Sequence, residues 1–194
     1  MKKINTKKLT VTSVLAAVVA VVSFLPLKTL GLEISFSMVP VAVGAICFGP
    51  AVGAILGAVF GVVSFLQCFG YSAFGALLLS ENPFFTAVMC IPTRILAGLF
   101  TGLIFKALSG KLNKLAFFVS SLCAPLLNTA FFMGALVLLF YQGDTVQNFV
   151  NLLSAANPFT FIILFVGING LVEIAAGFLV AYPVSRGLSK YLKF

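Results

Sequence analysis

The chain has 194 residues, of which 61% are hydrophobic and only 8% are charged, whereas soluble domains carry roughly 25% charged residues. This composition excludes a soluble globular domain and leaves room for about six membrane spans of ~20 residues each. The formal net charge is +8, but the basic residues lie between apolar runs. Basic residues at such positions mark which side of the membrane a loop lies on. We therefore expect membrane lipid as a partner, and no nucleic acid.

The hydropathy breaks predict an all-α, polytopic membrane protein with six transmembrane helices in a single domain. The second predicted span is shorter than the ~20 residues that usually cross a bilayer. The predicted spans are about residues 10–30, 34–48, 51–67, 84–108, 115–141 and 159–185.

The basic residues predict the orientation in the membrane. Acidic Glu33, Glu81 and Asp144 fall on the outer side if the N-terminus is cytoplasmic, while Lys28 lies outside and Arg94 lies within a span. Cytoplasmic loops carry the excess of Lys and Arg, so we expect both termini to be cytoplasmic. The ten basic residues on the cytoplasmic side are Lys2, Lys3, Lys7, Lys8, Lys106, Lys111, Lys114, Arg186, Lys190 and Lys193.

The first predicted helix carries a face of small side chains. Ala16 and Ala20 are four residues apart, with Ser13 and Ala17 beside them. Small side chains let neighbouring helices approach closely in a bilayer. Two interpretations stay open: this face packs inside the protein, or it contacts another membrane subunit.

Four glycines recur at four-residue intervals around the third predicted span: Gly49, Gly53, Gly57 and Gly61. In a soluble helix each would cost about 1 kcal/mol relative to alanine. In a bilayer the helix persists, because its backbone must bond internally, and a strip without side chains admits a neighbouring helix. The stripe therefore predicts close helix packing, with a glycine face along a substrate path as the alternative.

The outer ends of the spans carry two further features. The glycine-rich and aromatic segment 68–81 is either a lid over a pocket or a short interfacial helix. Asn82-Pro83-Phe84 opens the fourth span, and Asn157-Pro158-Phe159 opens the sixth. Asn followed by Pro is a common helix start, a cap plus a first-turn proline; the alternative is an internal duplication with matched pocket edges.

The polar residues inside the apolar spans are the main functional candidates. A charge at the bilayer centre costs ~2.5–3.5 kcal/mol even on the lenient insertion scale, yet Arg94 and Glu173 lie within predicted spans. Asn169 shares a helix face with Glu173, and Asn128 lies midway along the fifth span. These residues form a pocket for a small polar ligand, or make a buried ion pair with asparagine bonds between helices, and both can hold at once. The depth of Arg94 depends on whether the helix restarts at Pro92.

Several kinds of chemistry have no support in the sequence. There is no histidine and no tryptophan, and Cys47, Cys68, Cys90 and Cys123 are scattered without a Cys-x-x-Cys pair. We therefore expect no metal site and no cofactor. No phosphate-binding loop is present, because the residues around Lys111 lack its first glycine and its hydroxyl. We expect that the chain is not an enzyme and that it does not hydrolyse ATP unaided.

The motifs taken together resemble the substrate-binding (S) components of energy-coupling factor (ECF) transporters. The segment Met38–Val62 resembles their second and third helices. The other matching motifs are Asn82-Pro-Phe, Pro92-Thr-Arg-Ile, Leu127-Asn-Thr and Asn169-Gly-Leu-Val-Glu173, in order along the chain. Six spans in about 20 kDa also match, so the resemblance covers nearly the whole chain.

The resemblance implies a membrane subunit that captures a vitamin from outside with high affinity. Its implied partners are a transmembrane coupling subunit, which would dock on Ala16 and Ala20, and two cytoplasmic ATPases. The implied location is the bacterial plasma membrane. Ligand contacts in the family come from helices four to six and the outer loops. The candidate substrate-binding residues are therefore Arg94, Asn128, Asn169 and Glu173, with Gln67 and Asn82 near the outer ends of their spans.

A small carboxylate vitamin is the ligand that the residues favour, because an arginine in a membrane span suits bidentate binding of a carboxylate. The chain most resembles the pantothenate-type branch, although folate and biotin are also anions. The alternative function is a stand-alone, proton-coupled permease for a small organic anion, with Glu173 in the coupling. A structural membrane protein without a ligand is a third possibility. The polar residues inside the apolar spans argue against it, because burying them in the bilayer costs free energy.

Overall fold

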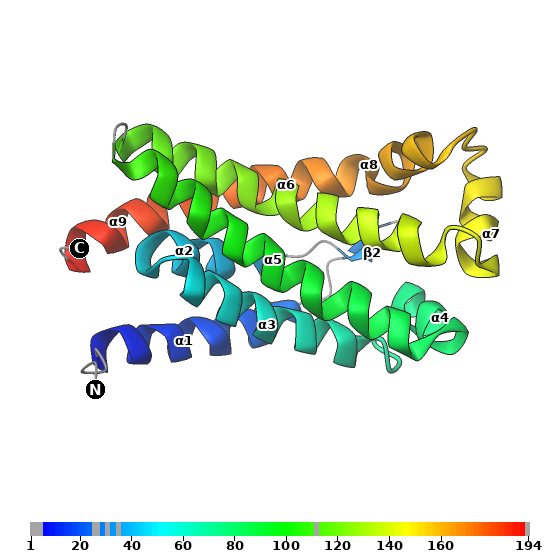
Figure 1. Cartoon of the computed structure of the whole chain (residues 1–194), viewed down its shortest axis with the longest axis horizontal. Coiled ribbons are helices and arrows are strands. Elements are labelled where there is room, and N and C mark those ends of the chain that lie inside the picture. The colour runs from blue at the N-terminus through cyan, green and yellow to red at the C-terminus, as the bar shows by residue number, and fades with distance from the viewer. Residues whose placement is uncertain (1–5, 25–27, 30–31, 34–35, 111–112, 193–194) are drawn as a thin grey trace.

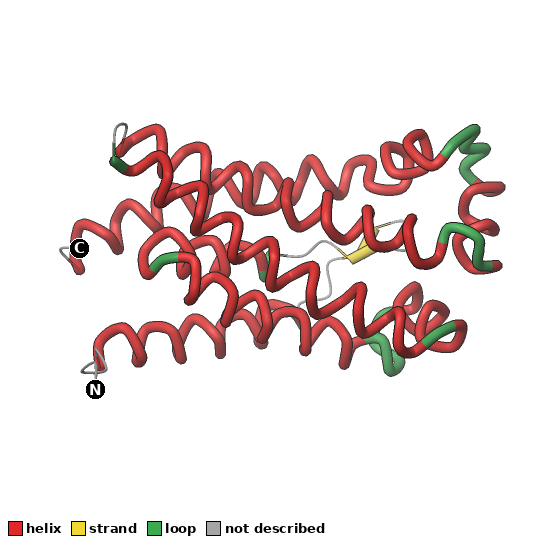
Figure 2. The backbone as a smooth tube through the Cα atoms, viewed as in Figure 1, coloured by secondary structure: helices red, strands yellow, loops and turns green. Residues whose placement is uncertain are grey.

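A computed structural model describes residues 6–24, 28–29, 32–33, 36–110 and 113–192. Within these ranges the chain is almost entirely helical, and the loops lie mainly at the two ends (Figure 2). The elements in chain order are α1 (Thr6–Ser23), β1 (Lys28–Thr29), β2 (Leu32–Glu33), α2 (Met38–Phe48), α3 (Pro50–Gln67), α4 (Ala73–Glu81), α5 (Pro83–Ser109), α6 (Asn113–Phe140), α7 (Asp144–Leu152), α8 (Pro158–Ala176), the π-helical segment η1 (Gly177–Ala181) and α9 (Tyr182–Leu192).

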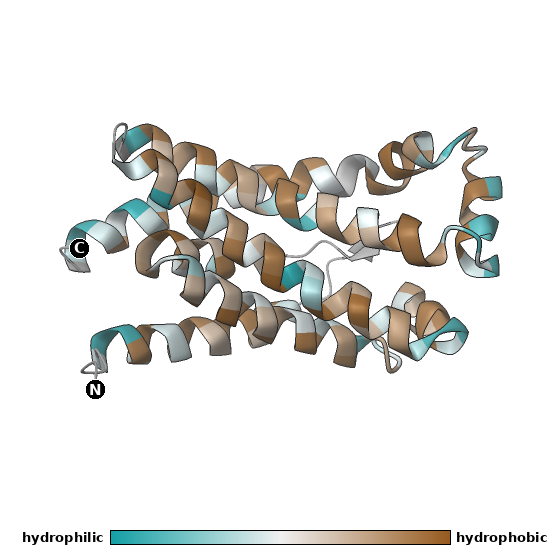
Figure 3. Cartoon of the chain, viewed as in Figure 1, coloured by the Kyte–Doolittle hydropathy of each residue, from teal (hydrophilic) through white to brown (hydrophobic). Residues whose placement is uncertain are grey.

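The long helices run along one axis of the molecule, and both ends of the chain lie at the same end of it (Figure 1). Hydrophilic residues gather mostly at the two ends, while the middle is largely apolar (Figure 3). We call the end that holds both termini the basic end, because it carries Lys7, Lys8, Lys106, Lys114, Arg186 and Lys190. The opposite end, with α4 and α7, we call the outer end.

Among the described residues, five helices are long and apolar enough to cross a membrane: Thr6–Ser23, Pro50–Gln67, Pro83–Ser109, Lys114–Phe140 and Gly170–Tyr191. Met38–Phe48 and Pro158–Gly167 are shorter apolar helices. This is the architecture of a polytopic, all-α membrane protein, as the sequence predicted.

The ends of the first and last predicted spans need correction. The first helix ends at Ser23 and not at residue 30, since β1 already pairs with β2, Lys28 opposite Glu33. Pro26 follows in the sequence, and proline disfavours helix at the preceding residue. The last span is not one regular helix. It is α8, then η1, then α9, and Gly167 inside α8 has φ 40° and ψ −130°, a conformation that only glycine adopts readily.

The glycine stripe packs α3 directly on the backbone of α5. A methyl group at Gly53 would collide with the carbonyl oxygen of Gly98, and one at Gly57 with that of Arg94. At Gly61 the added carbon would lie 2.8 Å from the Cα of Ile91. These three glycines therefore account for close helix packing.

Gly49, the fourth glycine of the series, has a different role. It joins α2 to α3 with φ 93°, and no atom lies within 4 Å of an added carbon there. Its position requires the left-handed backbone region, which glycine enters without steric cost.

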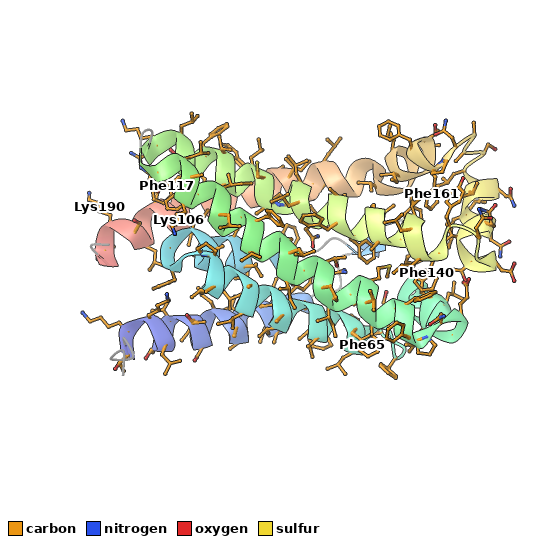
Figure 4. The ribbon with its side chains drawn as sticks, in the orientation of Figure 1. Phe65, Lys106, Phe117, Phe140, Phe161 and Lys190 are labelled. Atoms are coloured by element: carbon orange, nitrogen blue, oxygen red, sulfur yellow. The ribbon has the colours of Figure 1, made fainter. Side chains whose placement is uncertain are left out.

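Two apolar clusters divide the interior along the helices. The cluster toward the basic end contains Val19, Val41 and Ala97. The cluster toward the outer end contains Met89, Cys90 and many aromatic rings, and Phe140 and Phe161 are seen at that end in Figure 4. Cys90 and Ala97 lie on either side of Arg94 along α5, so the arginine sits where the two clusters meet.

We predict that Gly57→Ala destabilises the protein by about 1–3 kcal/mol, because the added methyl group must push the α3 and α5 backbones apart. Thermal unfolding in mild detergent measures this. Gly134→Ala on α6 is the matched control, since nothing lies within 4 Å of a carbon added there. It should leave stability unchanged or raise it. Equal midpoints for both variants would contradict the close packing of α3 on α5.

Candidate functional site

Arg94 lies deep in a continuous helix. α5 runs unbroken through Pro92, which settles the question that the sequence left open. Arg94 is eleven residues after Pro83, about 16 Å along the helix axis. Its side chain is 7% exposed.

The guanidinium group folds back toward the outer end of α5. Its Nη1 atom donates hydrogen bonds to the carbonyl oxygen of Met89 at 3.1 Å and to Oγ1 of Thr93 at 3.2 Å. The Thr93 hydroxyl itself donates to the same Met89 carbonyl. Helical side chains generally point toward the N-terminus of their helix, so the charge lies closer to the outer end than the Arg94 backbone does.

Two aromatic rings flank the charge. The Cζ atom of Arg94 lies 4.3 Å from the ring centroid of Phe132 on α6 and 5.4 Å from that of Phe60 on α3. Cation–π contacts of this kind are worth about 0.5–2 kcal/mol, and more when they are desolvated. The Glu173 carboxylate on α8 adds an electrostatic attraction to Arg94. Residues from four helices therefore act on one buried cation.

One donor of this buried group has no partner. The Nε atom of Arg94 is inaccessible and makes no hydrogen bond within the described part of the chain. A hydrogen bond to a charged group contributes about 1.5–3 kcal/mol, and leaving such a donor unsatisfied carries a comparable penalty. An acceptor that reached Nε would remove this penalty.

Asn128 supplies a complementary open acceptor on α6. It is 7% exposed, and its Oδ1 has no donor among the described residues. Asn128 precedes Phe132 by one helical turn, so both lie on the same face. It is twelve residues before Phe140, about 18 Å of helix, and thus at a depth similar to that of Arg94.

The other two predicted residues of the pocket lie on α8. Glu173 is half-buried and acts on Arg94 as described above. The side chain of Asn169 lies outside the described part of the structure, so its predicted role stays a prediction. β2 lies beside α8.

Gln67 and Asn82 make contacts within the fold. Nε2 of Gln67 donates to the carbonyl oxygen of Ser23 at 2.5 Å, which ties the end of α3 to the end of α1. Oδ1 of Asn82 accepts from the Phe85 backbone N–H at 3.0 Å, and Asn157 caps α8 in the same way through Thr160, at 2.8 Å. The two Asn-Pro motifs are thus helix caps. Whether Gln67 and Asn82 also contact a ligand stays a prediction.

The outer segment is a helix and not an irregular loop. α4 begins at the Ser72 cap, whose side chain accepts from the Gly75 N–H. Phe74 packs against Phe149 of α7 at 5.5 Å and Phe165 of α8 at 5.2 Å between ring centroids. Aromatic rings from three helices therefore pack together at the outer end.

The small-residue face of α1 is partly covered. Ala16 and Ala20 are half-buried, and Ala16 packs against the cluster toward the basic end. Ser13 and Ala17 beside them are exposed. In the most apolar 18-residue stretch of α1 only 6% is buried, whereas in that of α5 44% is buried. α1 therefore leaves most of its surface open to lipid or to another subunit.

Sequence reasoning missed the immediate surroundings of Arg94. Phe60, Phe132, Thr93 and the Met89 carbonyl were not among the candidates. Phe132 could have been found, since it follows Asn128 by four residues on the same helix face. Nothing local singles out Phe60 among 22 phenylalanines.

Comparison with known families assigns the chain. A family model described as "ECF transporter, substrate-specific component" matches residues 7–185, which is nearly the whole length. The chain belongs to this family. No individual curated protein matches it. This S component is accordingly a substrate-specific membrane subunit of an ECF transporter, and a transport subunit rather than an enzyme.

Asn82 offers a test that separates a cap from a ligand contact. We predict that Asn82→Ala destabilises the S component by about 1 kcal/mol, the usual cost of losing a helix cap. Asn82→Asp should restore stability, because a carboxylate oxygen can accept from the Phe85 N–H. Thermal unfolding and ligand binding are measured together, with Asn157→Ala and Asn157→Asp as matched controls. A stable Asn82→Asp variant with weak binding would show that the Asn82 amide contacts the ligand.

Proposed function

We propose that this S component binds a small carboxylate vitamin, of which pantothenate is the leading candidate, and delivers it to an ATP-driven importer. The observation that carries the proposal is the unpartnered Nε of Arg94 inside an apolar helix bundle. A guanidinium group presents planar N–H donors that match the two oxygens of a carboxylate. An anion bound there would supply the acceptor that Nε lacks.

The open acceptor on Asn128 narrows the ligand class. An oxygen without a donor favours a ligand that carries its own hydroxyl or amide N–H. Arg94 and Asn128 lie at similar depth on adjacent helices, so one small molecule could present a carboxylate to the first and a donor to the second. Pantothenate has a carboxylate, hydroxyls and an amide. Folate and biotin are also anions and are the main competitors for this assignment.

The remaining parts of the importer would lie on separate chains. We propose that a transmembrane coupling subunit and two cytoplasmic ATPases work with this S component in the bacterial plasma membrane. The weakly buried α1 is the surface that we propose for docking, around Ala16 and Ala20. Small side chains there would let a partner helix approach closely.

A proton-coupled permease is the alternative function, and transport assays separate the two. We expect uptake of radiolabelled pantothenate only when the S component is expressed with the coupling subunit and both ATPases. Collapsing the proton gradient should not abolish that uptake at constant ATP. Uptake by the chain alone that disappears with the gradient would support the permease and Glu173 as its proton-coupling residue. A ligand identified by mass spectrometry after purification would name the vitamin directly.

We predict that Arg94→Ala weakens ligand binding by at least about tenfold while the protein stays folded and inserted, because one charged hydrogen bond is worth about 1.5–3 kcal/mol. Isothermal titration in detergent measures the affinity. Lys106→Ala removes one positive charge from the same helix outside the site and should bind normally. If Arg94 served only to pair with Glu173, the double variant Arg94→Ala with Glu173→Ala would bind as well as the unmodified protein, and the ligand assignment would fail.

For docking, we predict that Ala16→Leu combined with Ala20→Leu blocks transport by the complete importer and leaves ligand binding to the isolated subunit near normal. The larger side chains would hold the partner helix away. Val14→Leu with Val21→Leu is the control, because these side chains are 57% and 68% exposed on another part of α1. Loss of binding and folding together would show that Ala16 and Ala20 pack internally. Unchanged transport would show that they do not dock.

A further inference from the structure

A polar cavity lies at the basic end, far from Arg94. It has a volume of about 410 Å³ and lies between the ends of α2, α5, α6 and α9. Phe105 and Phe117 form an apolar wall, with ring centroids 4.8 Å apart. Its polar lining comes from Ser109, Lys114, Arg186 and Ser189. Phe117 lies at the same end of the molecule as Lys106 and Lys190 (Figure 4).

The lining favours an anion. It combines two cationic side chains and two hydroxyls, and no acidic residue is among the residues that form it. The guanidinium of the exposed Arg186 donates a hydrogen bond through Nη1 to the Tyr182 hydroxyl at 3.1 Å. Tyr182 in turn stacks on Phe178, with ring centroids 5.7 Å apart. One of the two cations therefore has a hydrogen-bond partner on its own helix.

Two further hydroxyl groups lie one helical turn away from residues that line the cavity. Ser121 lies one helical turn beyond Phe117 on α6, and Ser185 lies one turn before Ser189 on α9. Both hydroxyls are fully buried, and neither has a partner among the described residues. Unpaired hydroxyl groups this close to the lining argue against a purely apolar occupant, such as the side chain of a partner helix.

The surroundings of the cavity favour a lipid over a soluble anion. The positive-inside rule places the basic end at the cytoplasmic face, where the leaflet carries anionic lipids. Beside the cavity, Leu115 and Phe118 are exposed on α6, by 45% and 42%. They offer acyl chains a surface next to the two cations. Basic pockets between transmembrane helices on the cytoplasmic side suit lipid headgroups.

We propose that this cavity binds the phosphate group of an anionic phospholipid from the cytoplasmic leaflet. Lys114 and Arg186 contact the phosphate oxygens, and Ser189 donates a hydrogen bond to one of them. Phe105 and Phe117 contact the glycerol and the upper acyl carbons. The site is independent of the ligand site at Arg94, so either proposal can fail without the other.

Native mass spectrometry of the full chain in mild detergent tests the proposal, with phosphatidylglycerol and phosphatidylcholine of identical acyl chains as probes. Phosphatidylglycerol should bind more tightly. Lys114→Gln with Arg186→Gln should weaken its binding by roughly 30-fold, since each cation near the membrane surface is worth about a factor of five. Ser189→Asp keeps both cations but adds a repelling charge in the cavity, and it should weaken binding as well.

Lys7→Gln with Lys8→Gln is the matched control. It removes the same charge from the same end of the molecule, on α1, and should leave phosphatidylglycerol binding unchanged. An equal loss in both double variants would mean diffuse attraction, and the proposal would be wrong. Displacement of the lipid by equimolar glycerol 3-phosphate would identify a soluble anion instead. If the variant Lys114→Gln with Arg186→Gln binds lipid normally but no longer associates with the coupling subunit, the cavity would be assigned to a protein partner instead.

Discussion

The direct contact between the α3 and α5 backbones is the constraint on which the rest of this structure depends. Helices in a bilayer gain no hydrophobic free energy from associating, so their contacts rest on close packing. Gly53, Gly57 and Gly61 provide it here, since a side chain at any of them would meet α5. Phe60 lies on the same stripe, three residues after Gly57 and one before Gly61. The contact that joins the two helices therefore also places an aromatic ring beside Arg94.

A buried guanidinium group in such a bundle must be stabilised by the protein itself. Inserting a charge into the bilayer centre costs about 2.5–3.5 kcal/mol. One charged hydrogen bond contributes about 1.5–3 kcal/mol and one cation–π contact up to about 2 kcal/mol, so together they are comparable with this cost. Arg94 makes two hydrogen bonds through Nη1, at 3.1 and 3.2 Å, and has two flanking rings. Its free Nε is thus not needed for folding. The unpaired Nε is the observation on which the proposed ligand site rests.

The sequence predicted well the features that depend on length and apolarity, and less well those that depend on one backbone position. The third, fourth and fifth predicted spans agree with α3, α5 and α6 to within a few residues. Pro92 could not be interpreted from sequence, because proline fits both the first turn of a helix and, at a cost, its interior. The bend at Gly167 was missed because glycine is also common within regular membrane helices. Phe60 and Phe132 reach Arg94 through packing between helices, which no local pattern encodes.

Two irregularities of the backbone flank Glu173, one inside α8 and one at its C-terminal end. Gly167 interrupts the helix six residues before it, and η1 begins at Gly177, four residues after it. A π-helical segment is a common mark of function within a helix. Glu173 thus lies in the stretch of α8 between Gly167 and η1. Arg94, in contrast, lies on the unbroken α5. An anion that binds Arg94 changes the attraction felt by Glu173. Glu173 is thus carried by the less regular of the two helices, which continues through η1 and α9 to the basic end.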